Sequence, residues 1–128
     1  MLDHIGFSVA DHARSRAFYV AALAPLGIVP VMDLTAAQTG SYEGTGFGSP
    51  GRPQFWVGAG DKRGGPVHVA FEAPSRAAVD AFYAAAIKAG GRDNGAPGIR
   101  PHYHANYYGA FVFDPDGHNI EAVSHAAE

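Results

Sequence analysis

The sequence predicts an α+β fold: a single domain over residues 1–128, built from two βαβββ modules related by a pseudo-twofold axis. Self-similarity is the first observation behind this prediction. LDHIGFSVADHARSRAFYVAALAPLGI aligns without a gap with PVHVAFEAPSRAAVDAFYAAAIKAGGR, which sets His4 against His68. Second, each copy begins as an alternating strand followed by an amphipathic helix. Third, both copies end in strand-like segments separated by turns. The modules are expected at residues 1–62 and 63–128, joined by the glycine-rich, charged segment GAGDKRGG.

The opening strand of each module is expected to have one apolar face and one face of small or polar residues. In residues 2–9, apolar side chains recur at every second position, and His4 falls between them. Residues 67–73 repeat this alternation, with His68 between the apolar positions. The apolar face should pack on the helix of its module, so both histidines should face a cavity.

A helix is expected after each opening strand. Asp11 and Ser75 are the expected N-caps, because their side-chain oxygens can accept hydrogen bonds from free backbone N–H groups. The triplet Ala-Phe-Tyr recurs in both segments and starts an apolar stripe at helical spacing. Gly27 should end the first helix, and Gly90 and Gly91 should end the second.

Three further strands are expected in each module. In the first module they are residues 28–34, a stretch near residues 38–47, and residues 54–58. In the second module a loop-rich piece over residues 92–104 precedes strands at 107–113 and 119–124, which the turn sequence DPDG connects. His118, next to this turn, is expected to be exposed, and His12 is expected at the surface.

Composition narrows the classes of partner. The 128 residues are 47% hydrophobic and 16% charged with a formal net charge of −3, which predicts a packed core and offers no basic stripe for nucleic acid. No apolar run approaches the roughly 18–20 residues that cross a bilayer, and the start MLDHIGFSVAD is too short and polar for a signal peptide. Cysteine is absent, which excludes disulfides and thiol chemistry. We expect a cytoplasmic protein that binds a small molecule.

Two imidazoles and one carboxylate are expected on the cavity faces of these strands. If the two copies pack about a pseudo-twofold axis, His4 and His68 can converge on one cavity. Glu121 lies between Ile120 and Ala122, which belong to the core face, so alternation directs its side chain into the cavity. Two histidines and a carboxylate form a facial triad with open coordination positions. We therefore expect one divalent metal ion, and the ligand types leave Zn, Fe, Mn, Ni and Co open.

Aromatic and polar residues of the second module are candidates for catalysis and substrate binding. Tyr108 is expected on the cavity side, on the assumption that Phe111 and Phe113 fill the core. Tyr108 and His102 are the catalytic candidates, since a phenol or an imidazole near a metal can donate a hydrogen bond or move a proton. Tyr103 is expected to line the substrate pocket. Plain packing or loop roles are the alternatives for these residues.

The repeat, the opening strands DHIGFSV and VHVAFEA, and the closing string FDPDGHNIEAV resemble the vicinal oxygen chelate superfamily over nearly the whole chain. That superfamily includes glyoxalase I, fosfomycin-resistance transferases, extradiol dioxygenases and metal-free bleomycin-binding proteins. The resemblance implies paired βαβββ modules that form a curved mixed sheet around a cleft. It also implies that the metal ligands are His4, His68 and Glu121.

One position departs from the glyoxalase I pattern, in which the last strand of the first module typically carries a further glutamate ligand. Here that strand reads PQFWVG, and aligning Pro50 with Pro115 sets Trp56 against Glu121. Gln54 could supply an amide oxygen in a different register. A three-ligand site is closer to the fosfomycin-resistance or extradiol-dioxygenase pattern. Trp56 and Gln54 are then expected to line the substrate pocket.

The leading expectation is a metalloenzyme whose substrate binds the metal through vicinal oxygens, with lyase, isomerase, transferase and ring-cleaving dioxygenase activities all open. The alternative is a metal-free small-molecule or drug-binding protein of the bleomycin-resistance type. A regulatory or structural domain is a third hypothesis, for which no interaction segment is evident. The family's habit and the uncovered sheet edges predict a homodimer. The sequence leaves open whether the cleft closes within one chain or across two.

Overall fold

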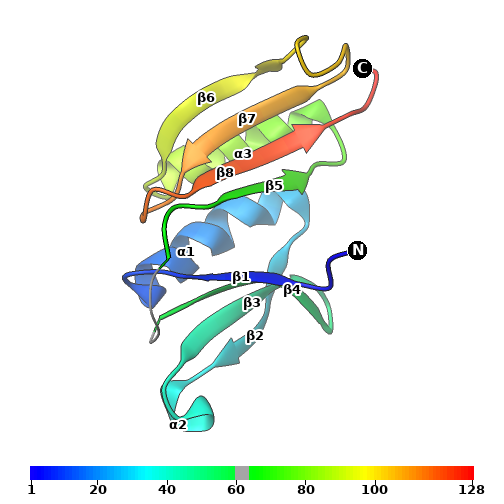
Figure 1. Ribbon diagram of the computed structural model, residues 1–128. Coiled ribbons are helices and arrows are strands. Elements are labelled where there is room, and N and C mark those ends of the chain that lie inside the picture. Colours follow the sequence, from blue (N-terminus) through cyan, green and yellow to red (C-terminus); the bar gives the residue numbers. More distant parts are fainter. Residues whose placement is uncertain (60–63) are drawn as a thin grey trace.

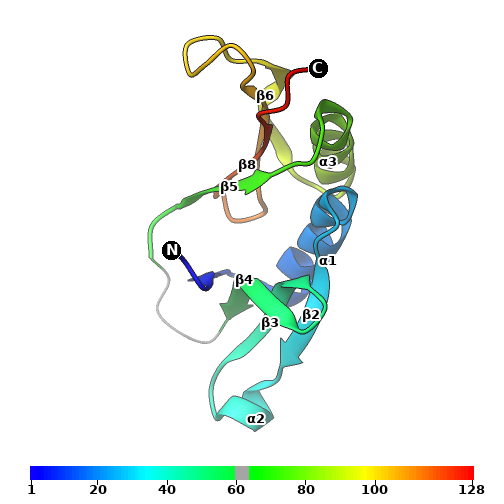
Figure 2. The ribbon, with the colours of Figure 1, turned by 90° about the vertical axis from the view of Figure 1, so that its right-hand side faces the viewer.

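The computed structural model describes residues 1–59 and 64–128, and these form two four-stranded sheets whose two longer helices, His12–Leu23 and Arg76–Lys88, lie side by side on one side of the sheets (Figure 1, Figure 2). The predicted linker spans residues 58–65, of which 58 and 59 end a strand, and its centre at 60–63, with the predicted module boundary, lies outside the described residues. Among the described helices, none has the length and apolar character that crossing a bilayer requires. The elements run in the order β1 (Ile5–Ser8), α1 (His12–Leu23), η1 (Ala24–Leu26), β2 (Val29–Leu34), α2 (Ala36–Thr39), β3 (Glu43–Ser49), β4 (Arg52–Ala59), β5 (His68–Glu72), α3 (Arg76–Lys88), β6 (Arg92–Ile99), β7 (Tyr108–Phe113) and β8 (Asn119–Ser124).

The two sheets repeat one topology. The strand order is β1-β4-β3-β2 in the first sheet and β5-β8-β7-β6 in the second, and in each the first strand is parallel to its neighbour. The register repeats as well, because Gly6 pairs with Trp56 and Ala70 pairs with Glu121. The predicted pair of βαβββ modules is therefore confirmed, and the two sheets do not close into one barrel.

Local signals fix the helix ends as expected. The Asp11 side chain accepts from the backbone N–H of Arg14, and the Ser75 side chain accepts from that of Ala78. Gly27 follows η1 with φ of 75°, a left-handed conformation that glycine adopts without steric cost.

Two segments differ from the sequence prediction. Residues 36–39 form a one-turn helix where a strand was predicted, because Thr35 and Gln38 build a capping box that starts a helix. Residues 92–99 form β6 where a loop-rich piece was predicted. Its pairing with β7 shifts register on both sides of Gly95, which explains its loop-like sequence.

An aromatic cluster joins the two modules on the face of the sheets that the helices cover. Tyr19 of α1 packs edge-on against Phe55 of β4, with ring centroids 5.0 Å apart. Phe55 in turn meets Phe71 of β5 at 5.0 Å and 89°, so the contact crosses from the first module to the second. Helices α1 and α3 also contact each other directly. One continuous core therefore sets how the two sheets stand relative to each other.

The DPDG turn of the second module is tied to α1 of the first. The buried Tyr19 hydroxyl donates to Asp114 Oδ2 at 2.7 Å, and Asp116 accepts from the backbone N–H of Ala10 at 2.9 Å. His118 was expected to be exposed, but that expectation is wrong: it is 5% exposed and its Nδ1 accepts from the Val67 N–H at 3.0 Å. The closing DPDGHN string therefore connects the two modules through hydrogen bonds and is not a free turn.

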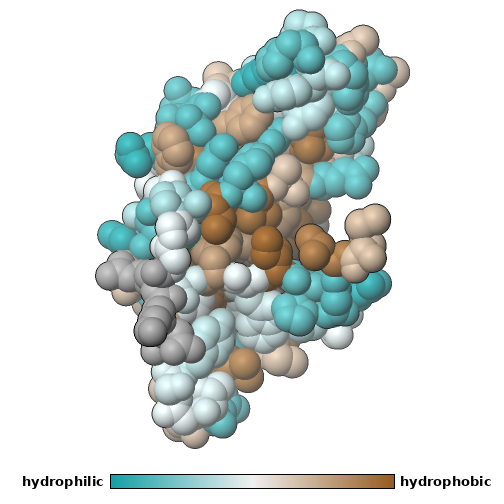
Figure 3. Space-filling model, viewed as in Figure 1, coloured by the Kyte–Doolittle hydropathy of each residue, from teal (hydrophilic) through white to brown (hydrophobic). Residues whose placement is uncertain are grey.

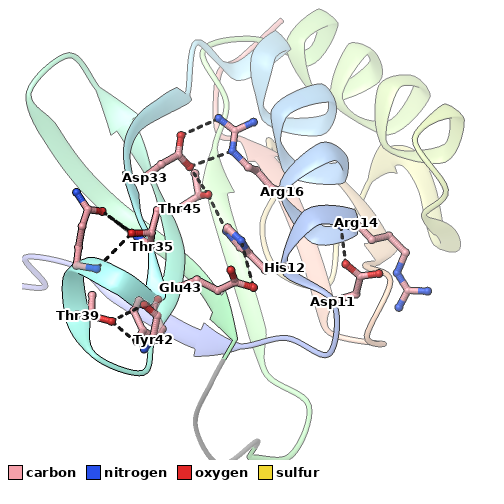
Figure 4. Close-up of polar contacts among 11 residues, drawn as sticks. Asp11, His12, Arg14, Arg16, Asp33, Thr35, Thr39, Tyr42, Glu43 and Thr45 are labelled. Atoms are coloured by element: carbon pink, nitrogen blue, oxygen red, sulfur yellow. Dashed lines mark hydrogen bonds and ion pairs between the residues drawn. The ribbon is translucent and has the colours of Figure 1, made fainter.

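A second polar cluster lies between α1 and strands β2 and β3 (Figure 4). Arg16 donates two hydrogen bonds to Asp33, at 3.0 and 2.9 Å. The Thr45 hydroxyl donates to Asp33 at 2.6 Å, so it must accept from His12 Nε2, which lies 2.9 Å away. His12 was expected at the surface, yet its side chain is only 13% exposed. The hydrogen bonds from Arg16 and Thr45 lower the pKa of Asp33 to about 2.

Tyr19→Phe should destabilise the fold by about 1–3 kcal/mol, because it leaves a buried carboxylate oxygen of Asp114 without its donor. Tyr83→Phe is the matched control, since its hydroxyl bonds the exposed Asp93 at 2.9 Å, and it should change stability little. Urea unfolding at neutral pH measures both variants. Equal losses of unfolding free energy in the two variants would contradict a buried hydrogen bond between the modules.

The Asp33 cluster should make stability depend on pH in acid. A carboxyl whose folded pKa is depressed contributes stability above its unfolded value of 3.8, and this contribution is lost as pH falls toward the folded value of about 2. The Asp33 side chain is 50% exposed, so screening should limit the effect to about 0.5–1 kcal/mol. Wild type and Asp33→Asn should therefore differ in unfolding free energy at pH 7 and converge between pH 4 and 2. A gap that does not change with pH would refute this.

Candidate metal centre

Glu121 is a buried carboxylate in the middle of β8. It is 2% exposed, and it lies on the sheet face away from the helices, between the core residues Ile120 and Ala122. The Tyr107 hydroxyl donates a very short hydrogen bond to its Oε1. Gly109 leaves room for this contact, since a Cβ there would come within 3.2 Å of both Glu121 Oε1 and the Tyr107 ring. Burial and the hydrogen bond to Glu121 raise the pKa of Tyr107 to about 12, so the phenol remains a donor at neutral pH.

His68 faces the second oxygen of this carboxylate. Its Nδ1 lies 2.9 Å from the Asn119 carbonyl oxygen, which can only accept, so we assign the proton to Nδ1. In the tautomer that carries its proton on Nδ1 alone, Nε2 presents a lone pair to Glu121 Oε2 at 3.2 Å. Two such electron pairs repel unless a proton or a cation lies between them. A backbone carbonyl on Nδ1 and a free Nε2 are the usual arrangement of a metal-binding histidine, so the pair fits a divalent metal.

His4 lies on the other sheet, away from this pair. Its Nδ1 is 2.6 Å from the Asp3 carboxylate, which leaves Nε2 free in the same way. It borders a hollow of about 380 Å³ together with Trp56. Within residues 1–59 and 64–128, no three His, Cys, Asp or Glu side chains gather closely enough to hold one metal ion. One copy of the chain therefore brings together two of the three expected ligands.

The three residues expected to line a pocket fall on three different surfaces, and Trp56 lies in the hollow next to His4. Gln54 borders an apolar cleft of about 630 Å³ between the modules, on which His68 also lies. The cleft contains much of the apolar surface between the two sheets in Figure 3. Tyr103, which is 60% exposed, packs at a tilt of 50° against Tyr107 with ring centroids 4.7 Å apart and so stands at the rim of the Glu121 site. His102 packs its ring on Tyr103 at 4.2 Å and lies further out.

The expectation that Tyr108 faces the cavity is wrong. Its hydroxyl donates to Asp80 of α3 at 2.7 Å, on the helix side of the sheet. The face of β7 that carries Phe111 instead lies beside Glu121, because these two residues are directly paired across β7 and β8. Two aromatic residues were placed in the core by hydrophobicity alone. Counting back from the DPDG turn would have paired Phe111 with Glu121 and exposed the error.

Two aromatic residues that bear on the site were not predicted from the sequence. Tyr107 shares its strand parity with Phe111, so assigning that face to the core excluded Tyr107 from the site, but its hydroxyl donates to Glu121. Tyr42 lies beside Trp56 in the hollow next to His4. The signal for Tyr42 is the alternation of glycines in the following strand, EGTGFG, which clears one face of the sheet for a large ring.

Comparison with known proteins agrees with this architecture. The family model described as Glyoxalase/Bleomycin resistance protein/Dioxygenase superfamily matches residues 1–122. No curated protein gives a significant match to the sequence. Among solved structures, a glyoxalase/bleomycin resistance protein from Albidiferax ferrireducens T118 is 30% identical with a TM-score of 0.72, and the match covers 97% of this chain and 98% of that one.

More distant structures share the fold. Glyoxalase I from Zea mays matches with a TM-score of 0.74 at 18% identity, over 99% of this chain but only 45% of the maize chain. A glyoxylase/bleomycin resistance protein/dioxygenase domain from Frankia sp. EAN1pec has a TM-score of 0.71 at 16% identity, over 97% of this chain and 96% of that one. At such identities the likeness extends to the fold alone, and this chain spans less than half of the maize enzyme.

Proposed function

We propose that this chain is a metal-dependent enzyme of lyase or dioxygenase type that acts on a small substrate with neighbouring oxygen atoms. The chain belongs to the Glyoxalase/Bleomycin resistance protein/Dioxygenase superfamily. The observation that carries the proposal is the pairing of His68 Nε2 with the buried Glu121 carboxylate at 3.2 Å. A structural ion pair at the surface would not need a carboxylate that is 2% exposed.

His68, Glu121 and His4 would hold the metal and leave coordination positions open for the substrate. A bound divalent ion supplies Lewis acidity toward the oxygens of the substrate. The protein's own part is to orient the ligands: the Asn119 carbonyl fixes the His68 ring, and Tyr107 fixes Glu121. The Tyr103 ring packs at a tilt against the ring of Tyr107, with centroids 4.7 Å apart.

The third ligand is proposed to come from a second copy of the chain. His4 sits on the first sheet and the His68–Glu121 pair on the second, while β1 and β5 are edge strands without a described partner on their outer side. Because the modules share one register, a twofold arrangement with β1 of one copy beside β5 of the other brings His4 toward His68 and Glu121. Such a homodimer would also cover the apolar cleft between the sheets.

A metal-free binder of small molecules or drugs is the second candidate function. Trp56 favours it, because the first module has an aromatic ring at the position where the second has Glu121. The two histidines and the carboxylate favour the enzyme instead, since a purely aromatic pocket has no use for a buried carboxylate directed at an imidazole. Metal binding therefore separates the two candidates.

Glu121→Gln and His68→Ala should weaken binding of Zn²⁺ or Ni²⁺ at least about 10–100-fold, because each removes a direct ligand. Glu72→Gln is the matched control, an exposed glutamate on the neighbouring strand β5, and it should bind metal as wild type does. Titration calorimetry and elemental analysis of the dialysed proteins give affinity and stoichiometry. Equal metal content in wild type and the Glu121 variant would reject the metalloenzyme.

Ile5→Lys should convert a dimer into a monomer and weaken metal binding, because Ile5 lies on β1 and lines the cleft that a partner would cover. Ile99→Lys is the matched control, since Ile5 and Ile99 are each 38% exposed but Ile99 lies at the end of β6. Light scattering at micromolar concentration reads the oligomeric state. A monomeric wild type that still binds metal with full affinity would exclude the two-copy site.

A further inference from the structure

Strand β3 carries glycines at alternate positions on the sheet face away from the helices. Gly44, Gly46 and Gly48 share this face, and Gly46 pairs directly with Trp56 on β4. In the second module the residue paired in the same way with Glu121 is Phe111. Glycine weakens a strand because it offers no side chain for packing. Gly48 leaves room for backbone, since a Cβ there would come within 2.0 Å of the Arg52 carbonyl oxygen, so the space at Gly44 and Gly46 remains to be explained.

Two aromatic rings occupy that space. A Cβ on Gly46 would come within 2.7 Å of Trp56 Cζ2, and a Cβ on Gly44 or Gly58 would come within 2.3 Å of the Tyr42 hydroxyl oxygen. Side-chain carbon atoms do not approach so closely, so any other residue would push the rings away. Tyr42 and Trp56 hence lie against bare backbone instead of standing out from the sheet.

The outer faces of these rings border a hollow next to His4. Tyr42, Trp56, His4 and Leu34 line a space of about 380 Å³, and both rings are partly exposed. Gly6, paired with Trp56, leaves room for the start of the Trp56 side chain, since a Cβ there would meet Trp56 Cβ at 3.1 Å. The rings of Tyr42 and Trp56, which lie against the backbone, therefore form one side of a hollow that His4 also borders.

We propose that Tyr42 and Trp56 form a stacking floor for a planar aromatic group of the substrate, held beside the metal. The position of this group beside the metal rests on the proposed function, in which His4 is a metal ligand and so marks where the substrate oxygens would be bound. A ring that stacks on a flat indole and phenol gains offset-stacked contact that a puckered ring of equal size does not. The substrate class is accordingly an aryl compound with neighbouring oxygens next to the ring.

The test compares benzohydroxamate with cyclohexanecarbohydroxamate on nickel-loaded protein. Both probes carry the same pair of neighbouring oxygens, and they differ in having a planar or a puckered ring. We expect benzohydroxamate to bind about 5- to 10-fold more tightly, the ratio that one aromatic pair typically supplies. Trp56 is the only tryptophan of the chain, so quenching of intrinsic fluorescence by the aryl probe reports directly on this ring.

Two variants remove the floor in different ways. Tyr42→Leu deletes one ring, and Gly46→Val displaces Trp56 through the 2.7 Å clash. Each should abolish the aryl preference while affinity for the cyclohexyl probe and nickel stoichiometry stay unchanged. Gly64→Val is the matched control, because nothing lies within 4 Å of a Cβ at Gly64. Should Gly46→Val fail to fold, Tyr42→Leu alone decides.

The outcomes separate this inference from the proposed function. Equal binding of both hydroxamates without quenching, in protein that retains nickel, would overturn the stacking floor: the rings would then only shield glycine backbone. If nickel is not retained, the metal proposal fails, and titration of metal-free protein with benzoate and cyclohexanecarboxylate takes its place. Quenching and tighter binding by benzoate alone would then support the floor, and their absence would overturn it.

Discussion

Glu121 is a carboxylate that is 2% exposed inside a strand, and a carboxylate so buried needs hydrogen-bond donors or cations directed at it. Tyr107 supplies one donor, and His68 brings a ring nitrogen to the other oxygen. The Asn119 carbonyl holds the proton of His68 on the far side of that ring. His68 and Glu121 would hold a divalent cation, which would remove the repulsion between Nε2 and Oε2, so the proposed chemistry centres on this pair.

The fold explains why His68 and Glu121 lie together and why one copy of the chain lacks the third ligand beside them. Both modules repeat one register, so equivalent positions face the same side of equivalent sheets. The first module has glycines and aromatic rings near His4, whereas the second has the buried carboxylate. The aromatic core and the Tyr19–Asp114 bond set the two sheets relative to each other and leave β1 and β5 as free edges along an apolar cleft. A partner copy would supply what each half lacks.

The sequence predicted the module fold because repeat, alternation and caps are local signals that tertiary structure did not override. His68 and Glu121 were brought together as expected, since a parallel pair with a repeated register places them on adjacent strands. The separation of His4 could not be foreseen, because alternation defines a face but not how two sheets stand to each other. Tyr108 was misplaced because hydrophobicity assigned Phe111 to the core, whereas strand pairing assigns it to the site. His118 was misjudged because its burial depends on Val67 in a distant segment.

Subunit complementation tests the central claim most directly, that His4 of one copy and the His68–Glu121 pair of another form one metal site. His4→Ala and Glu121→Ala proteins, each unable to bind metal tightly, are refolded together in equal amounts, and bound Zn²⁺ is measured. The account expects recovery to about a quarter of the wild-type content, because random pairing makes about half of the dimers mixed and each mixed dimer has one intact site. No recovery above the separate variants, with mixed dimers demonstrably formed, would contradict it.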